Sequence, residues 1–210
     1  MLKNFRLLVF FSIAISNNSL FAKENNVYES SGYQATITRD RWGVPHISGK
    51  RDEDAAFGLA YAHADDDIKN IAENMVLYRA QSGLKQGFQG AAADYLIKAL
   101  DFTSLIKEKY ESDLSVEVRN VIEGYAAGLN YWNEINDNNK YKSIFPISSK
   151  DIVTGFVIQN LLFSGVVSEI QRLQEGRTEF NQENPSQSHL FRQYQNILGS
   201  NAIAIGPNKT

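Results

Sequence analysis

The sequence predicts an α+β chain that is mainly helical and begins with a β-hairpin. Three observations predict this class: an extended pattern at residues 33–48, a helical period that starts at Asp52, and a small apolar run between glycines at residues 199–206. Hydrophobic residues make up 43% of the 210 residues and charged residues 21%, which excludes a disordered or collagen-like chain.

Charge and cysteine content exclude several classes of function. The 21 Lys and Arg against 24 Asp and Glu give a formal net charge of -3, so the sequence has none of the basic excess that favours nucleic acid as a partner. It has no Cys, which removes disulfide scaffolds, thiolate zinc sites and cysteine nucleophiles. Any nucleophile must therefore be an oxygen or a nitrogen.

Residues 1–22 predict a signal peptide. Lys3 and Arg6 precede an apolar core at residues 7–15, and a short polar stretch ends at Ala22. A membrane anchor is the alternative, but nine helical residues rise only about 13 Å, whereas a bilayer core is about 30 Å thick. We therefore expect export to the periplasm or secretion, cleavage after Ala22, and no membrane span in the remaining chain.

A hairpin and a long helix follow the signal. Residues 33–39 (YQATITR) and 44–48 (VPHIS) predict two strands with Gly43 at their turn. From Asp52 onward apolar residues recur at steps of three and four, which predicts a helix with Gly83 as its stop. The residues of this stripe are Phe57, Tyr61, Ala64, Ile68, Ile71, Met75 and Tyr78.

Two further helices and a buried strand complete the expected order. An apolar stripe predicts a helix over 114–132, and residues 148–151 (SSKD) predict a capping box before a helix from 152 to about 167. From about residue 171, polar residues predict a linker or exposed arm. The apolar run at 202–205 predicts a central strand, which needs neighbours on both sides. This chain does not supply them, so we expect it to be an incomplete polypeptide.

Three motifs, in their order and spacing, resemble the penicillin acylase family. The first is 39–47 (RDRWGVPHI) followed by 54–66 (DAAFGLAYAHADD), the second is 123–130 (EGYAAGLN), and the third is 198–206 (LGSNAIAIG). The family also includes the acyl-homoserine lactone, aculeacin and cephalosporin acylases. The resemblance covers nearly all of the chain after residue 22.

The resemblance implies an N-terminal nucleophile hydrolase. In such enzymes an exported precursor cuts itself before a serine and becomes a heterodimer whose larger chain starts with that serine. The implied fold has four αββα layers, of which this chain holds the mainly helical part. We expect residues 23–175 to correspond to the smaller chain, 176–199 to an excised spacer, and 200–210 to the truncated start of the larger chain, which is the expected partner.

Ser200 is the predicted catalytic residue, and the bond between Gly199 and Ser200 is the predicted cleavage site. A serine hydroxyl needs a base within reach, and cleavage gives Ser200 its own α-amino group with a reference pKa of about 7.7 to 8.0. Gly199 has no Cβ, which suits the strained backbone needed for attack on its carbonyl. By itself a Gly-Ser pair before a strand is most often a turn, so the other motifs carry this assignment.

The resemblance also implies secondary site residues. Gln159, Leu162 and Phe163 match positions that line the acyl pocket in the family, although core packing explains them equally well. Glu169, within 163–169 (FSGVVSE), matches a calcium-binding glutamate, with an exposed glutamate at a helix end as the alternative. Structural calcium at this residue is the one metal that the resemblance suggests, and no other cofactor is expected.

The remaining polar candidates favour structural roles. His46, in a predicted strand, and His63, on the long helix, are interpreted as hydrogen-bonded structural residues. The acidic run at residues 65–67 is interpreted as a solvated helix face or a helix break rather than a cation site.

Two classes of function stay open. The first is an exported hydrolase of carbon–nitrogen bonds in linear amides, with a small-molecule substrate in which an acyl group is joined to a β-lactam nucleus or a homoserine lactone. The second is a non-catalytic secreted helical fragment or one half of a split enzyme. Because the oxyanion hole of the family lies in its larger chain, we expect the 210-residue chain alone to be inactive.

Overall fold

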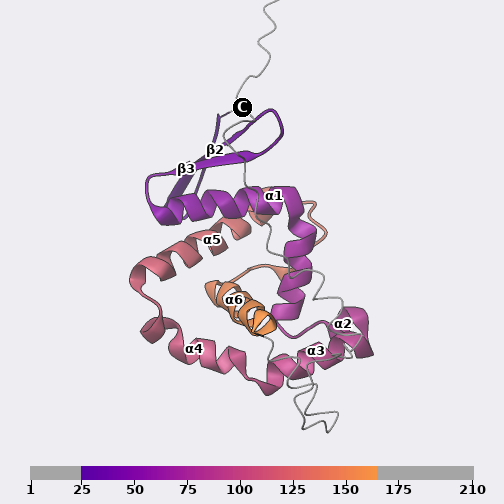
Figure 1. Cartoon of the computed structure of the whole chain (residues 1–210). Coiled ribbons are helices and arrows are strands. Elements are labelled where there is room, and N and C mark those ends of the chain that lie inside the picture. Colours follow the sequence, from indigo (N-terminus) through magenta and orange to yellow (C-terminus); the bar gives the residue numbers. More distant parts are fainter. Residues whose placement is uncertain (1–24, 165–210) are drawn as a thin grey trace, which may run out of the picture.

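The computed structural model describes residues 25–164 (Figure 1). The predicted signal peptide, spacer and start of the larger chain lie outside these residues. The elements are β1 (Asn25–Ser30), β2 (Tyr33–Arg39), β3 (Pro45–Gly49), α1 (Asp52–Tyr78), α2 (Gly83–Gln86), α3 (Phe88–Ala99), α4 (Phe102–Asp113), α5 (Val116–Ile135), the 3-10 helix η1 (Lys142–Ile144) and α6 (Ser149–Phe163). The expected class, mainly helical with a small antiparallel sheet, is confirmed.

The sheet is antiparallel, with strand order β1-β2-β3. The predicted hairpin is confirmed: β2 pairs with β3 so that Ile37 lies opposite Ile47, and Gly43 occupies the turn with a φ of 83°. Asp40 closes this turn by accepting hydrogen bonds from the backbone N–H groups of Trp42 (2.9 Å) and Val44 (3.0 Å). The edge strand β1 was not predicted, because its sequence NNVYES carries no apolar run.

The long helix α1 begins at Asp52 as predicted, but Gly83 is not its stop. The helix ends at Tyr78, Ala80 takes a positive φ of 51°, and Gly83 opens α2. The prediction was wrong because the turn that ends the helix uses a non-glycine residue in the left-handed region, which periodicity does not show.

A break at Asp67 divides α1 into two parts that point in different directions (Figure 1). Asp67 has non-helical backbone angles (φ -151°, ψ 54°), and its carboxylate accepts a hydrogen bond from the backbone N–H of Asn70 at 3.3 Å. The side chain thus caps the second part of the helix. The acidic run therefore marks a helix break, as one of the two interpretations predicted.

Helices α1 and α5 pack at very short range. A Cβ on Gly124 would lie 2.3 Å from the carbonyl oxygen of Glu53, and one on Gly128 would lie 2.1 Å from that of Phe57. The two glycines are four residues apart on α5, and their two contact residues are four residues apart on α1. Two small residues on one face of α5 therefore let the two backbones touch. This contact explains the two glycines of the 123–130 motif.

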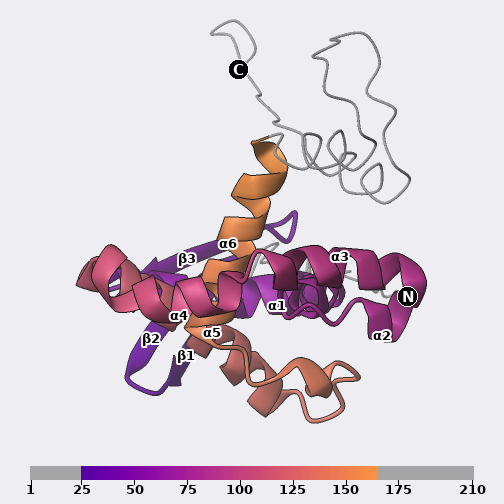
Figure 2. The ribbon, with the colours of Figure 1, turned by 90° about the horizontal axis from the view of Figure 1, so that it is seen from below.

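Two hydrophobic cores result from this arrangement. The first lies between the sheet, α1 and α5, and includes Ile37, Tyr61, Met75, Leu129 and Trp132. The second joins the end of α1 to α3, α4 and α6, and includes Leu77, Ala80, Ile97, Phe102, Ile106 and Ile158. Figure 2 shows α6 running across the direction of α3 and α4, with its C-terminal end projecting beyond them. Helix α6 contributes Val153, Val157, Ile158 and Leu161 to the packing of the second core.

Candidate functional site

A mainly apolar pocket of about 430 Å³ lies between α1, α5 and α6. Each helix contributes one wall, and the three walls come from segments that are far apart in the sequence. The lining residues are Ala56, Leu59, His63, Ile71, Asn74, Met75 and Tyr78 from α1, Val121, Ile122, Tyr125 and Leu129 from α5, and Ile152, Gly155, Phe156 and Gln159 from α6. Its size falls within the range of small-molecule sites, and its walls suit an apolar group.

One polar pair stands in this pocket. The hydroxyl of Tyr125 and Nδ1 of His63 share a hydrogen bond of 2.6 Å between α5 and α1. Burial is the main cause, and the neighbouring Tyr78 the smaller one, that raises the pKa of Tyr125 to about 12. Its hydroxyl therefore stays neutral at physiological pH. This contact agrees with the structural interpretation of His63 and also places the residue at the pocket.

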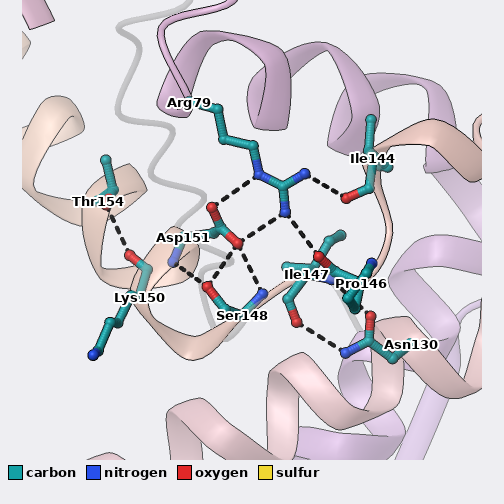
Figure 3. A network of polar contacts seen from close by, with 9 residues as sticks. All are labelled: Arg79, Asn130, Ile144, Pro146, Ile147, Ser148, Lys150, Asp151 and Thr154. Atoms are coloured by element: carbon teal, nitrogen blue, oxygen red, sulfur yellow. Dashed lines mark hydrogen bonds and ion pairs between the residues drawn. The ribbon is translucent and has the colours of Figure 1, made fainter. Parts of the chain in front are cut away.

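A network around Arg79 fixes the start of α6 (Figure 3). Its Nε and Nη2 donate to the two carboxylate oxygens of Asp151 at 3.0 and 2.9 Å. The same guanidinium donates to the carbonyl oxygens of Ile144 (2.6 Å) and Pro146 (2.9 Å). Asp151 also accepts hydrogen bonds from the N–H and the hydroxyl of Ser148, which completes the predicted capping box. A single carboxylate therefore joins the end of α1 to the first turn of α6.

The electrostatics of this network favour a charged Asp151. Burial alone would raise the pKa of Asp151, but the hydrogen bonds from Arg79 and Ser148 outweigh it and hold the pKa below its ordinary value. Only 24% of the Arg79 side chain and 17% of the Asp151 side chain are exposed, so water screens this bidentate pair less than a surface pair.

Other motif residues hold the elements around the pocket. Arg39 pairs with Asp65 (3.0 Å) and Asp66 (2.8 Å), which ties the end of β2 to the middle of α1. The side-chain amide of Asn130 donates to the carbonyl oxygen of Ile147 (2.9 Å) and accepts from its N–H (2.8 Å), so α5 holds the segment that leads into α6. These residues of the quoted motifs thus have structural roles.

The structure places only some of the predicted site residues. Gln159 lines the pocket, whereas Phe163, one turn later, is 56% exposed and lies outside its walls. Helix α6 includes Leu162, whose side chain is not described. Gly199, Ser200 and Glu169 lie outside the described residues.

Within residues 25–164, no three His, Asp or Glu side chains are placed to hold a metal ion, the acidic run at 65–67 included. His46 lies in β3, where its ring is 3.5 Å from the carboxylate of Asp40. Over the same range, no helix is both long and apolar enough to cross a bilayer.

Sequence reasoning missed the importance of Tyr125 and Arg79. Tyr125 lies within the helix that the apolar stripe predicts over 114–132, and nothing in its local sequence pairs it with His63, which is 62 residues away. Arg79 follows the predicted stripe, and its partner Asp151 is 72 residues away. The capping box at 148–151 was the one available signal, because it identified Asp151 as an ordered carboxylate.

The fold and the pocket define a mainly helical α+β chain with an apolar pocket between three helices. Residues 34–210 match the sequence model of the family described as penicillin amidase. The chain therefore belongs to the penicillin amidase family, whose members are amide-hydrolysing acylases.

Individual relatives agree with this assignment. An alignment 225 positions long shows 24% identity to acyl-homoserine lactone acylase PvdQ of Pseudomonas savastanoi pv. phaseolicola. It covers 93% of this chain and 28% of the relative. It is 31% identical over 96 residues to penicillin acylase 2 proenzyme of Pseudomonas sp. (45% of this chain, 12% of the relative). It is 25% identical over 133 residues to aculeacin-A acylase of Actinoplanes utahensis (58% and 17%). The matches thus span between 12 and 28% of the length of these relatives.

A solved structure supports the fold. A chain of the thermostable penicillin G acylase from Alcaligenes faecalis aligns with a TM-score of 0.54 and 18% identity. The alignment covers 84% of this chain and 98% of the solved one, so the two are of similar length. At this identity the likeness shows that the two chains share a fold.

Proposed function

We propose that this chain is the N-terminal part of an exported amidohydrolase precursor that acts through Ser200 as an N-terminal nucleophile. The observation that carries the proposal is the family match, which runs to residue 210 and therefore includes the Gly199 and Ser200 pair. The word proenzyme in the name of one relative agrees with a precursor.

The proposed chemistry has two stages. First, the Ser200 hydroxyl attacks the carbonyl carbon of Gly199, the peptide C–N bond breaks as the nitrogen takes a proton, and water hydrolyses the resulting ester. This step frees the α-amino group of Ser200. Second, that amine takes the proton of the hydroxyl as it attacks the substrate amide, and the amine product leaves with a proton. Water then releases the acid from the acyl-enzyme.

The proposal includes the processing of the chain. Residues 1–22 are removed on export to the periplasm or outside the cell, residues 23–175 form the smaller chain, and residues 176–199 are excised. Residues 200–210 begin the larger chain, which is the partner and supplies the oxyanion hole. Glu169 is the residue that would hold a structural calcium ion at the junction between the two chains.

The substrate of the proposed enzyme is a linear amide with an apolar acyl group joined to a β-lactam nucleus or a homoserine lactone. The pocket supports the acyl part, since its walls are apolar and Gln159 lies on its α6 side. Leu162 and Phe163 follow on the same helix, and the exposed ring of Phe163 is available to the larger chain.

The test is intact-mass spectrometry of a precursor in which this chain is continued to the length of its relatives. We expect the wild type to separate between Gly199 and Ser200 without added protease, and Ser200→Ala to stay uncut and inactive. Ser188→Ala, in the proposed spacer, is the matched control and should separate like the wild type. Cleavage of the same bond in Ser200→Ala would show that an outside protease makes the cut and would overturn the proposal.

A non-catalytic secreted fragment, or one half of a split enzyme, is the second candidate. The observation that favours it is that the matches span 12 to 28% of these relatives. A wild-type precursor that stays uncut and hydrolyses no amide would favour this candidate.

A further inference from the structure

We infer that Arg79 is a positioning residue: its clamp on Asp151 sets the angle of α6 against α1 and α5, and through it the place of Gln159 in the pocket. The inference rests on the proposed function for its substrate class, because it assigns to Arg79 control over which acyl groups the pocket accepts.

Two consecutive residues at the end of α1 hold α6 at two points. Arg79 holds Asp151 through two hydrogen bonds. The ring of Tyr78 packs closely against Gly155: a Cβ at position 155 would lie 2.4 Å from the tyrosine ring. Asp151, Gly155 and Gln159 are spaced four residues apart and therefore share one face of the helix. The held points and the pocket residue thus lie in one row.

A tilt of α6 at Asp151 is therefore passed along the helix to Gln159. Asp151 and Gln159 are eight residues apart, which corresponds to about 12 Å along a helix, so a tilt of about 10° at the clamp moves Gln159 by about 2 Å. The C-terminal end of α6 projects beyond α3 and α4 (Figure 2), and Ile158 is packed in the second core one residue before Gln159. A small change at the clamp therefore changes the pocket wall.

Removing Arg79 should free the helix angle without unfolding α6. The two hydrogen bonds of the capping box join Ser148 and Asp151 to each other, although Arg79 shares the Asp151 carboxylate, so the first turn keeps its cap when Arg79 is replaced. Ile158 is 5% exposed within the second core, and this packing of α6 does not depend on Arg79. The role of Arg79 is therefore distinct from a general contribution to folding.

The absence of native cysteine allows a direct measurement of the helix angle. Glu73 on α1 and Asn160 on α6 are both exposed, and Glu73→Cys with Asn160→Cys gives one spin-label pair that joins the two helices. In the 210-residue chain we expect Arg79→Gln to shift the label-to-label distance or to widen its distribution at least twofold. Asp151→Asn should do the same, because an amide cannot make the charged bidentate pair.

Arg119 provides the matched control. It also bonds a carboxylate and a backbone carbonyl, both of Glu111 on α4, so Arg119→Gln removes a similar contact away from α6. We expect this variant to keep the wild-type distance distribution. If Arg79→Gln and Asp151→Asn both keep the wild-type distribution while their circular dichroism shows a folded chain, the inference is overturned. If Arg79→Gln does not fold, Asp151→Asn alone decides it.

A second measurement tests the consequence for the substrate in the processed enzyme. Across amides that differ only in acyl chain length, we expect Arg79→Gln to raise KM at least fivefold for some lengths, to keep kcat within twofold, and thus to change the order of preference. Arg79→Lys should recover part of the wild-type order. An unchanged order in Arg79→Gln overturns the control over acyl groups. A wild type without amidase activity overturns the proposed function instead, and the distance measurement still decides the clamp.

Discussion

The ring of Tyr78 lies directly against the backbone of Gly155, leaving no room for a side chain on α6. A Cβ at position 155 would stand 2.4 Å from one ring carbon and 2.7 Å from another. Because both residues line the pocket, this contact sets how closely α6 approaches α1.

Gly155→Ala should therefore destabilise the chain despite the higher helix propensity of alanine. In an open helix interior the exchange stabilises by about 1 kcal/mol. Here the clash should reverse the sign and cost about 1 to 3 kcal/mol. The measurement is the free energy of unfolding in urea. In a Tyr78→Leu background the same substitution should be neutral or stabilising, and an equal cost in both backgrounds would refute the contact.

Gly128→Ala should loosen the packing of α1 on α5. A methyl group there meets the carbonyl oxygen of Phe57 at 2.1 Å and the side chain of Ala60 at 2.9 Å, and backbone atoms cannot move aside at low cost. We expect a loss of about 2 kcal/mol or more in the free energy of unfolding, measured by thermal or urea denaturation. Glu134→Ala, on the exposed end of α5, should stay within about 0.5 kcal/mol of the wild type. A neutral Gly128→Ala would contradict the close approach.

Asp54 should make stability depend on acidic pH. Its hydrogen bonds with Arg51, supported by the N–H of Gln34, lower its pKa to about 2 although the residue is buried. Since the folded pKa lies below the unfolded value of about 3.9, the contribution is complete above that value and disappears as the pH falls toward 2.

The measurement is urea unfolding of the wild type and Asp54→Asn between pH 2 and pH 7. The variant should lose about 1 to 3 kcal/mol near neutral pH and approach the wild type at the acid end. Asp52→Asn, an exposed residue of the same helical turn, is the control and should follow the wild-type curve. A constant difference between Asp54→Asn and the wild type at every pH would exclude the assigned pair.

Export should depend on the first 22 residues. Expressed with its own N-terminus in a Gram-negative host, the protein should be found in the periplasm and begin at Lys23, because Lys3, Arg6 and the apolar core have the pattern of a signal peptide. N-terminal sequencing of the periplasmic fraction tests this. Phe11→Arg interrupts the apolar core and should keep the protein in the cytoplasm. Soluble cytoplasmic wild type with intact Met1 would remove the prediction.

Sequence reasoning alone reached much of the fold. The hairpin with Gly43 at its turn, the start of α1 at Asp52 and the capping box from Ser148 to Asp151 were all predicted and confirmed. Each depends on residues within a few positions of one another. Turn chemistry, helical period and capping are local rules, so the order of the residues is enough to apply them.

The tertiary structure decided the rest. The pairs His63 with Tyr125 and Arg79 with Asp151 join residues 62 and 72 positions apart, and the close approach of Gly128 to Phe57 spans two helices. Such contacts depend on how the helices cross, which is set by the summed packing of many side chains rather than by a local pattern. The sequence by itself therefore determined the hairpin, the start of α1, the cap of α6 and the family motifs, whereas the pocket and the clamp on α6 exist only once three distant helices have packed together.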